Sequence, residues 1–200
     1  MKIKTVLITA MIAAASVAAA DDTNSIAKPP ARERVLIVPA HPDDLSSALG
    51  FCLVTRDIFE IHVVDFTHGE RGCGPANFEN GWTKAKRTAE EQRVCDAIGA
   101  TLHWLDEVDG EAYACRETCD RLARLIMELK PAAVIAHWPV DIHGDHTMAG
   151  AAALKAVFTA SDKDYKPEVY FFDQGYQAKY KGDFKIQMKR QGDDDRLITR

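Results

Sequence analysis

Two short segments of the sequence are crowded with side chains that bind metal ions. The first reads Pro-Ala-His-Pro-Asp-Asp at residues 39–44, and the second reads Asp-Ile-His-Gly-Asp-His at residues 141–146. One imidazole and one carboxylate from the first segment, with one imidazole from the second, would supply His41, Asp44 and His146 as ligands. Catalytic zinc commonly has three protein ligands and leaves a fourth position for water. The sequence therefore predicts one divalent metal ion, zinc by preference, although these ligands also suit Fe(II), Co(II) or Ni(II).

Each of these residues also has an ordinary structural interpretation. Asp43 or Asp44 could cap the helix that follows, because Asp is a favoured N-cap residue and stabilises the positive end of a helix. His41, His143 and His146 could be loop histidines that bind nothing. Neither segment contains the cysteines that a structural zinc site would favour. The two segments taken together favour a metal site over these separate explanations.

The elements that must position the two segments follow from hydrophobic patterning. Apolar runs predict strands at 35–38, 61–66, 102–105, 132–136 and 169–172, and helical spacing predicts helices at 44–54, 82–98, 115–129 and 146–158, with a glycine-rich loop at 67–80. This alternation predicts an α/β fold, a Rossmann-like doubly wound and mostly parallel sheet with helices on both faces. Ligands bind outside the carboxyl ends of the strands in such sheets. Since each metal-binding segment follows a strand, we expect the two to meet there.

The first twenty residues are typical of a secretory signal peptide. Lys2 and Lys4 precede an apolar run, and a small-residue cleavage site ends at Ala20. The alternative, a transmembrane anchor, is disfavoured because the run is shorter than the roughly 20 residues that span a bilayer. We therefore expect an exported protein, periplasmic or secreted, that is cleaved near Ala20 and has no stable membrane insertion.

Composition excludes several classes of partner. The net charge is −5 and no basic stripe is present, so neither nucleic acid nor an anionic membrane is an expected partner. The residues that follow the signal peptide suffice for one core without disulfides. Five cysteines are present, an odd count that leaves at least one free thiol or an intermolecular bond. Cys52 and Cys95 are expected to be buried apolar residues, and the disulfide pairing stays open.

The two metal-binding segments together resemble the paired signature of the LmbE-like, PIG-L-type zinc-dependent N-deacetylases. Weaker resemblances are the loop Thr-His-Gly-Glu-Arg-Gly at 67–72, the Arg-x-x-Glu helix at 87–90, and Asp109-Gly110. The resemblance runs from about Val35 to Phe172. It implies a deacetylase domain at 34–178, preceded by a polar lead-in at 21–33 and followed by a charged tail at 179–200, either disordered or truncated.

The resemblance also implies a role for each matching residue. His41, Asp44 and His146 would be the metal ligands, Asp43 the general base, His143 the group that stabilises the oxyanion, Asp145 the residue that orients His143, and Arg87 a substrate-binding residue. Such enzymes act on N-acetylated amino sugars, often N-acetylglucosamine joined to another group, and often form homo-oligomers.

The chemistry of these residue types agrees with this assignment. A metal-bound water would be the nucleophile, because a metal lowers the pKa of water from 15.7 to about 7. Asp43 could take its proton and pass it to the leaving amine, and a cationic His143 could hold the oxyanion. Arg87 could bind sugar hydroxyls or phosphate, or could simply be a solvated helix residue.

Two residues within the segments depart from the family pattern. Leu45 stands where the family usually has an acidic residue, and Gly144 stands where it has proline.

The alternatives to a sugar deacetylase are a related amidase for another acylated amine and a non-catalytic exported metal- or glycan-binding protein. A binding protein would not need Asp43 or His143, so their presence favours an enzyme. A nucleotide-binding domain is disfavoured because no Gly-x-Gly-x-x-Gly follows the first strand.

Overall fold

The computed structural model describes residues 31–172 of the chain. The chain divides into two compact units, residues 1–32 and 33–200, and the description below concerns the second. The expected signal peptide, nearly all of the polar lead-in and the charged tail lie outside the described residues. Within the part that is described, no helix is both long and apolar enough to cross a membrane.

Five parallel strands form one sheet. They are β1 (Glu33–Val38), β2 (Phe59–Thr67), β3 (Thr101–Glu107), β4 (Ala133–His137) and β5 (Glu168–Phe172), in the order β3-β2-β1-β4-β5. The chain builds outward from β1 through β2 to β3, then crosses to β4 on the other side of β1. The strand order therefore reverses between β1 and β4, the point at which such folds bind ligands. The loops that follow these two strands are the two metal-binding segments.

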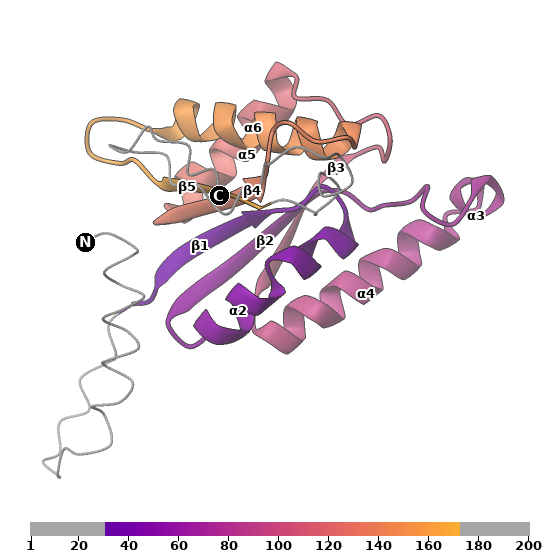
Figure 1. The fold of residues 1–200 in the computed structure, drawn as a ribbon, viewed down its shortest axis with the longest axis horizontal. Helices are drawn as coiled ribbons and strands as arrows, with labels where there is room; N and C mark the ends of the chain where they lie inside the picture. The colour runs from indigo at the N-terminus through magenta and orange to yellow at the C-terminus, as the bar shows by residue number, and fades with distance from the viewer. Residues whose placement is uncertain (1–30, 173–200) are drawn as a thin grey trace, which may run out of the picture. The chain divides into compact units, whose positions relative to one another are not determined.

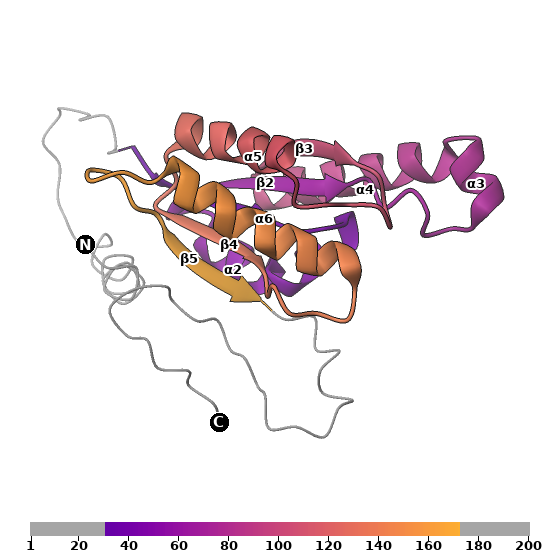
Figure 2. The ribbon, with the colours of Figure 1, turned by 90° about the horizontal axis from the view of Figure 1, so that it is seen from above.

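Helices cover both faces of the sheet, as the sequence predicted. The helices α2 (Leu49–Thr55) and α4 (Trp82–Ile98) lie on one face, and α5 (Arg116–Leu129) and α6 (Gly144–Ala160) lie on the other (Figure 1). Seen from above, α5 and α6 lie side by side over the sheet with α2 beneath it (Figure 2). The short helix α3 (Pro75–Glu79) lies beyond the end of the sheet, inside the segment predicted as a glycine-rich loop.

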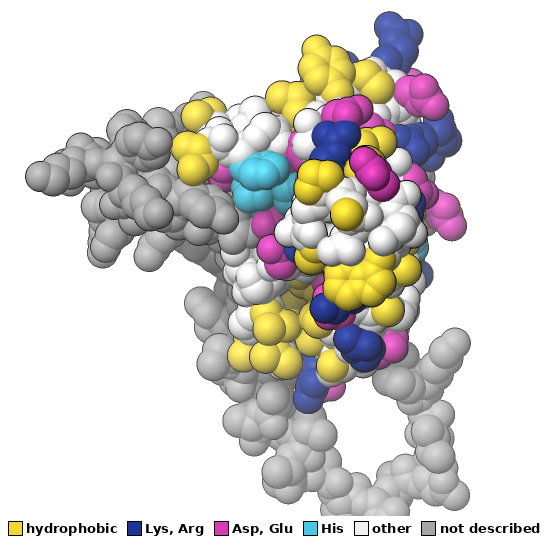
Figure 3. Space-filling view, turned by 90° about the vertical axis from the view of Figure 1, so that its right-hand side faces the viewer, with side chains coloured by type: hydrophobic (Ala, Val, Ile, Leu, Met, Phe, Trp, Pro, Cys, Tyr) yellow, Lys and Arg dark blue, Asp and Glu magenta, His cyan; other side chains and the backbone are white. Residues whose placement is uncertain are grey.

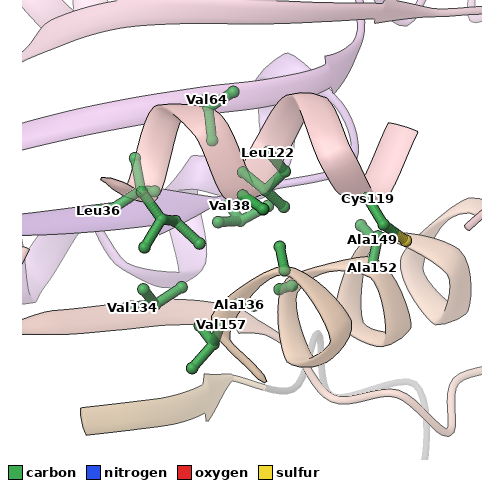
Figure 4. Packing of buried hydrophobic residues seen from close by; sticks show 14 of the residues in the cluster. Leu36, Val38, Val64, Cys119, Leu122, Val134, Ala136, Ala149, Ala152 and Val157 are labelled. Atoms are coloured by element: carbon green, nitrogen blue, oxygen red, sulfur yellow. The ribbon is translucent and has the colours of Figure 1, made fainter. Parts of the chain in front are cut away.

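The core between the sheet and the α5/α6 layer fixes the position of the second metal-binding segment. Leu36 and Val38 of β1 are fully buried against Leu122 of α5 and the small residues Ala149 and Ala152 of α6 (Figure 4). A helix whose inner face is alanine can approach a sheet closely, because no large side chain separates them. The first turn of α6 is thereby held against the end of β4.

The single helix predicted at 44–54 is wrong. The structure has a 3-10 helix, η1 (Pro42–Ser47), followed at Leu49 by α2. The cause is local, because the Asp44 carboxylate accepts a hydrogen bond from the His41 backbone N–H at 2.9 Å. The Asp44 side chain therefore turns back toward the strand end, and the first turn is tighter than an α-helix. This break brings His41 and Asp44 together.

Candidate metal centre

A cavity of about 300 Å³ opens at the carboxyl ends of the strands. Its lining comes from the loop after β1 with η1, from the loops after β2, β3 and β4, and from α4 and α6: His41, Asp43, Asp44, Arg71, Gly72, Arg87, Asp109, His143 and His146. Histidine side chains with acidic groups beside them are exposed on this face of the molecule (Figure 3). The cavity therefore contains all the expected site residues except Asp145, which lies directly behind it.

The carboxylate of Asp44 is the hub of the site. Its Oδ2 atom lies 3.0 Å from Nδ1 of His41, 3.1 Å from Nε2 of His137 and 3.3 Å from Nε2 of His146. Burial alone would raise the pKa of Asp44, but hydrogen bonds with His137, His146 and His41 hold it well below its usual value. Asp44 is therefore ionised, with three imidazoles around one oxygen.

His41 lies between carboxylates on both sides of its ring. Its Nε2 atom is 3.0 Å from Oδ2 of Asp145 and 3.4 Å from Oδ1 of Asp109. Burial lowers the pKa of His41, but hydrogen bonds with Asp109, Asp145 and Asp44 outweigh it and raise the pKa to about 11. Without a metal both ring nitrogens of His41 therefore carry a proton, and a metal that binds one of them must displace the proton there.

His146, in the first turn of α6, presents Nε2 to the same hub. Its other ring nitrogen, Nδ1, lies 3.4 Å from Oδ1 of Asp141. Burial lowers the pKa of His146, but Asp44 and Asp141 outweigh this and raise it. A carboxylate behind one ring nitrogen favours the proton there and leaves the other nitrogen for a metal, as in many metal sites.

The donor set fits a divalent metal ion. Four overlapping groups among the described residues could each place one ligand atom per residue within 4.8 Å of the others: His41 with His143 and His146, Asp44 with His137 and His146, His41 with Asp43 and Asp44, and His41 with Asp109 and Asp145. Imidazole nitrogen with carboxylate oxygen suits zinc and other first-row transition metals. The structure brings together the three expected ligands, and it places other candidate ligands around them.

Asp43 lies at the mouth of the cavity and is held by Arg87. Oδ1 of Asp43 accepts from Nη2 of Arg87 at 2.5 Å, while Nη1 of Arg87 donates to the carbonyl of Gly69 at 3.1 Å. The guanidinium fits because two glycines leave room, and a Cβ at Gly72 would lie 2.5 Å from Nη1. The Asp43 side chain remains 73% exposed. Arg87, expected to bind substrate, thus lines the cavity and also fixes the expected general base.

His143 is oriented differently from the sequence expectation. The resemblance assigns this task to Asp145, but the Asp145 carboxylate contacts His41 and accepts from the backbone N–H of Gly110 at 2.7 Å. The backbone N–H of Asp145 donates instead to Nδ1 of His143, at 3.3 Å. Burial, with the nearby His41 and His146, lowers the pKa of His143. A neutral ring with Nδ1 as acceptor carries its proton on Nε2.

His137 was not among the site residues predicted from the sequence, and Asp109 had no predicted role. His137 is the last residue of β4, one position beyond the predicted strand, and its side chain is fully buried. A histidine at the carboxyl end of a buried parallel strand was the signal available for it. Asp109 contacts His41 and accepts from the backbone N–H of Arg71 at 2.9 Å. The resemblance included Asp109-Gly110 but did not indicate its contacts, because both partners of Asp109 are distant in sequence.

Two buried acids lie near the metal-binding loop. Both carboxyl oxygens of Asp65 on β2, and Oε1 of Glu91 on α4, have no hydrogen-bond partner among residues 31–172. Burial and the charge of Glu91 raise the pKa of Asp65 well above its usual value. Burial, with the charges of Asp43 and Asp44, raises the pKa of Glu91 to about 8. Burial thus disfavours the ionised form of both carboxyls.

Known proteins share this sequence pattern and fold. The model of the PIG-L family, described as GlcNAc-PI de-N-acetylase, matches residues 36–157. A 4-oxalmesaconate hydratase of Pseudomonas putida is 29% identical over 144 residues, which are 68% of this chain and 56% of the hydratase. The chain thus spans little more than half the length of that curated relative.

Two solved structures have the same fold. One is a 4-carboxy-2-hydroxymuconate hydratase from Pseudomonas putida, with a TM-score of 0.62, 25% identity, and coverage of 74% of this chain and 68% of that chain. The other is an N,N'-diacetylchitobiose deacetylase from Pyrococcus horikoshii, with a TM-score of 0.62, 24% identity, and coverage of 70% and 60%. With the family match extending from β1 through most of α6, the chain belongs to the PIG-L family of LmbE-like deacetylases.

Proposed function

We propose that this chain is a metal-dependent N-deacetylase, with zinc as the preferred metal, that removes an acetyl group from an amino sugar or its conjugate. The observation that carries the proposal is the position of Asp43. It is an exposed carboxylate beside the buried His41, Asp44 and His146, yet it is held by Arg87 and not by those histidines. A site that only stored metal would have no use for a carboxylate held in this way.

The metal ligands in this proposal are His41, Asp44 and His146, of which the last uses Nε2. When bound, a divalent metal lowers the pKa of water and polarises a carbonyl oxygen. Asp43, at the cavity mouth, accepts the proton of the attacking water and returns it to the leaving amine. Arg87 keeps the Asp43 carboxylate turned toward the cavity during both transfers.

His143 faces the developing charge in this proposal. Its Nε2 carries the proton because Nδ1 accepts from the Asp145 backbone. An N–H directed at the carbonyl oxygen stabilises the tetrahedral oxyanion, and the loss of one such donor typically costs 10²–10³-fold in kcat. The imidazole does this as a neutral donor, which differs from the cationic form expected from the sequence.

The cavity and its position limit the substrate. A volume of about 300 Å³ is at the lower end for small-molecule sites, so one acylated sugar unit would be enclosed while the rest of a conjugate stays outside. Arg71 and Arg87 in the wall suit hydroxyl or anionic groups. We also propose that the protein acts after export, on the basis of the composition of residues 1–20.

A hydratase is the second candidate, favoured by one specific observation. The 29% identical relative is named a 4-oxalmesaconate hydratase, and its name implies a substrate with several carboxylates. Arg71 and Arg87 could bind such groups. The same base would then take a proton from water that adds to a carbon–carbon double bond rather than to an amide.

One assay with two readouts separates these candidates. The full zinc-loaded chain is incubated with N-acetylglucosamine glycosides and lipids while free amine and acetate are measured, and with 4-oxalmesaconate while loss of its absorbance is measured. Equimolar amine and acetate supports the deacetylase. Loss of absorbance with no amine from any amide overturns the deacetylase in favour of the hydratase.

A further inference from the structure

His137 is the most deeply buried histidine of the site. Its side chain has 0% exposure, and its Nε2 lies 3.1 Å from Oδ2 of Asp44. Its ring stacks on His146, with centroids 4.1 Å apart and planes at 17°, and packs against Phe172 at 4.4 Å. It thus contacts two of the three proposed metal ligands directly while lying outside the cavity lining.

The hydrogen bond determines which atom of His137 carries the proton. A carboxylate oxygen can only accept, so Nε2 of His137 must donate to Oδ2 of Asp44. The other ring nitrogen distinguishes His137 from His146. Asp141 lies 3.4 Å from Nδ1 of His146 and favours the proton there, which leaves Nε2 of His146 for a metal. Nδ1 of His137 has no hydrogen-bond partner among residues 31–172, so the proton of this ring stays on Nε2, where Asp44 accepts it. His137 therefore donates a hydrogen bond to the Asp44 carboxylate and does not serve as a further metal ligand.

The fold holds this donor in one place. Gly150 of α6 lies so close to the end of β4 that a Cβ there would be 2.4 Å from the His137 carbonyl oxygen and 3.0 Å from Cα of Pro139. Because both contacts are with backbone atoms, the helix and the strand end cannot move apart without opening the core. His146 lies one turn before Gly150, so the same close approach sets the stack of His137 on His146.

We propose that His137 is a positioning residue for the metal centre, which fixes the Asp44 carboxylate by the hydrogen bond that its Nε2–H donates. The proposal rests on the metal site of the proposed function but not on the reaction. Donors behind a ligating carboxylate orient it, and their loss typically weakens metal binding 10- to 100-fold.

The test is a zinc competition titration against a chromogenic chelator, using the full chain with His137→Gln and His137→Met. Gln and Met are nearly equal in length, but only Gln can donate a hydrogen bond. Far-UV circular dichroism of the metal-free proteins checks the fold, and His137→Phe, which keeps a ring in the stack, replaces His137→Met if the latter does not fold.

We expect His137→Met to raise the zinc dissociation constant 10- to 100-fold, and His137→Gln to restore it to within about threefold of the unaltered chain. Unchanged affinity in both variants overturns the proposal. Equal loss in both folded variants also overturns it, because packing and not the donor would then be responsible. Neither result depends on deacetylation, so a failure here is distinguishable from a failure of the proposed function.

Discussion

Arg87 donates a hydrogen bond to Asp43 at 2.5 Å, although 44 residues separate the two in sequence. The same guanidinium is fixed from behind by the carbonyl of Gly69 and fits into space left by Gly72. The glycine-rich loop after β2 therefore determines the position of Arg87, and through it the orientation of Asp43. Its glycines make room for the side chain that orients the proposed base.

Gly72→Ala should lower turnover while leaving metal binding intact. The added Cβ would lie 2.5 Å from Nη1 of Arg87, so the guanidinium must shift and release Asp43. Misplacement of a reacting group by about 1 Å can cost up to 10²-fold, and we expect a loss of kcat of about tenfold or more. The measurement is amine release together with zinc content.

Gly50→Ala is the matched control for that variant, because nothing lies within 4 Å of a Cβ at Gly50. It should keep full activity. A Gly72→Ala enzyme with unchanged kcat would show that the position of Arg87 does not matter for the reaction.

Much of this arrangement follows from the sequence, for identifiable reasons. The apolar run at 35–38 and the small apolar run before His137 are typical of buried parallel strands, and they predicted that the metal-binding segments meet at one edge of the sheet. The break between η1 and α2 was not predictable from spacing, because it depends on where the Asp44 side chain turns.

Contacts between distant residues account for what the sequence did not reveal. The Asp145 carboxylate was expected on its neighbour His143, but it contacts His41, which is 104 residues away. The role of Arg87 in α4 likewise depends on Asp43, which lies in η1. Hydrophobic periodicity reports which face of an element is buried, but not which polar groups meet across loops.

Gly150→Ala should destabilise the fold and weaken metal binding. Helix propensity alone would favour Ala by up to about 1 kcal/mol. The Cβ would, however, meet the His137 carbonyl oxygen at 2.4 Å, and backbone atoms cannot move aside as a side chain can. We expect a net loss of about 1–3 kcal/mol in the free energy of unfolding, measured by urea denaturation.

Gly144→Ala provides the comparison on the same helix, since no atom lies within 4 Å of its added Cβ. It should unfold at nearly the same urea concentration as the unaltered chain. Equal stability of the two variants would mean that α6 does not need its close approach to β4.

Glu91→Gln should stabilise the metal-free protein at high pH. The folded-state pKa of Glu91 is about 8, against 4.5 for the ordinary side chain, so between these values the unfolded state binds fewer protons than the folded state. Stability contributed by this group is complete below pH 4.5 and is lost as the pH rises toward 8. The variant should gain on the order of 1–3 kcal/mol at pH 8 and little at pH 5.

The measurement is the free energy of unfolding across pH 5–8.5, with the exposed neighbour Glu90→Gln as the control. If Glu91→Gln and the unaltered chain lost stability in parallel as the pH rose, the buried acid at position 91 would not be the cause.

His41→Ala should abolish stoichiometric metal binding, and so should His146→Ala. Each removes an imidazole that converges on Asp44, and two remaining ligands hold a metal weakly. Metal content after dialysis is the readout. His103→Ala, on β3 and hydrogen-bonded to His62, should retain one equivalent. One equivalent in His41→Ala as well would remove His41 from the ligand set.

The most direct test compares Asp43→Asn with the unaltered chain, both zinc-loaded, for metal content and for amine release from N-acetylglucosamine conjugates. We expect one equivalent of zinc in both proteins, amine release by the unaltered chain, and a rate at least about 10²-fold lower in the variant. Equal rates in the two proteins, or no release by the unaltered chain from any of these conjugates, would contradict the proposed function.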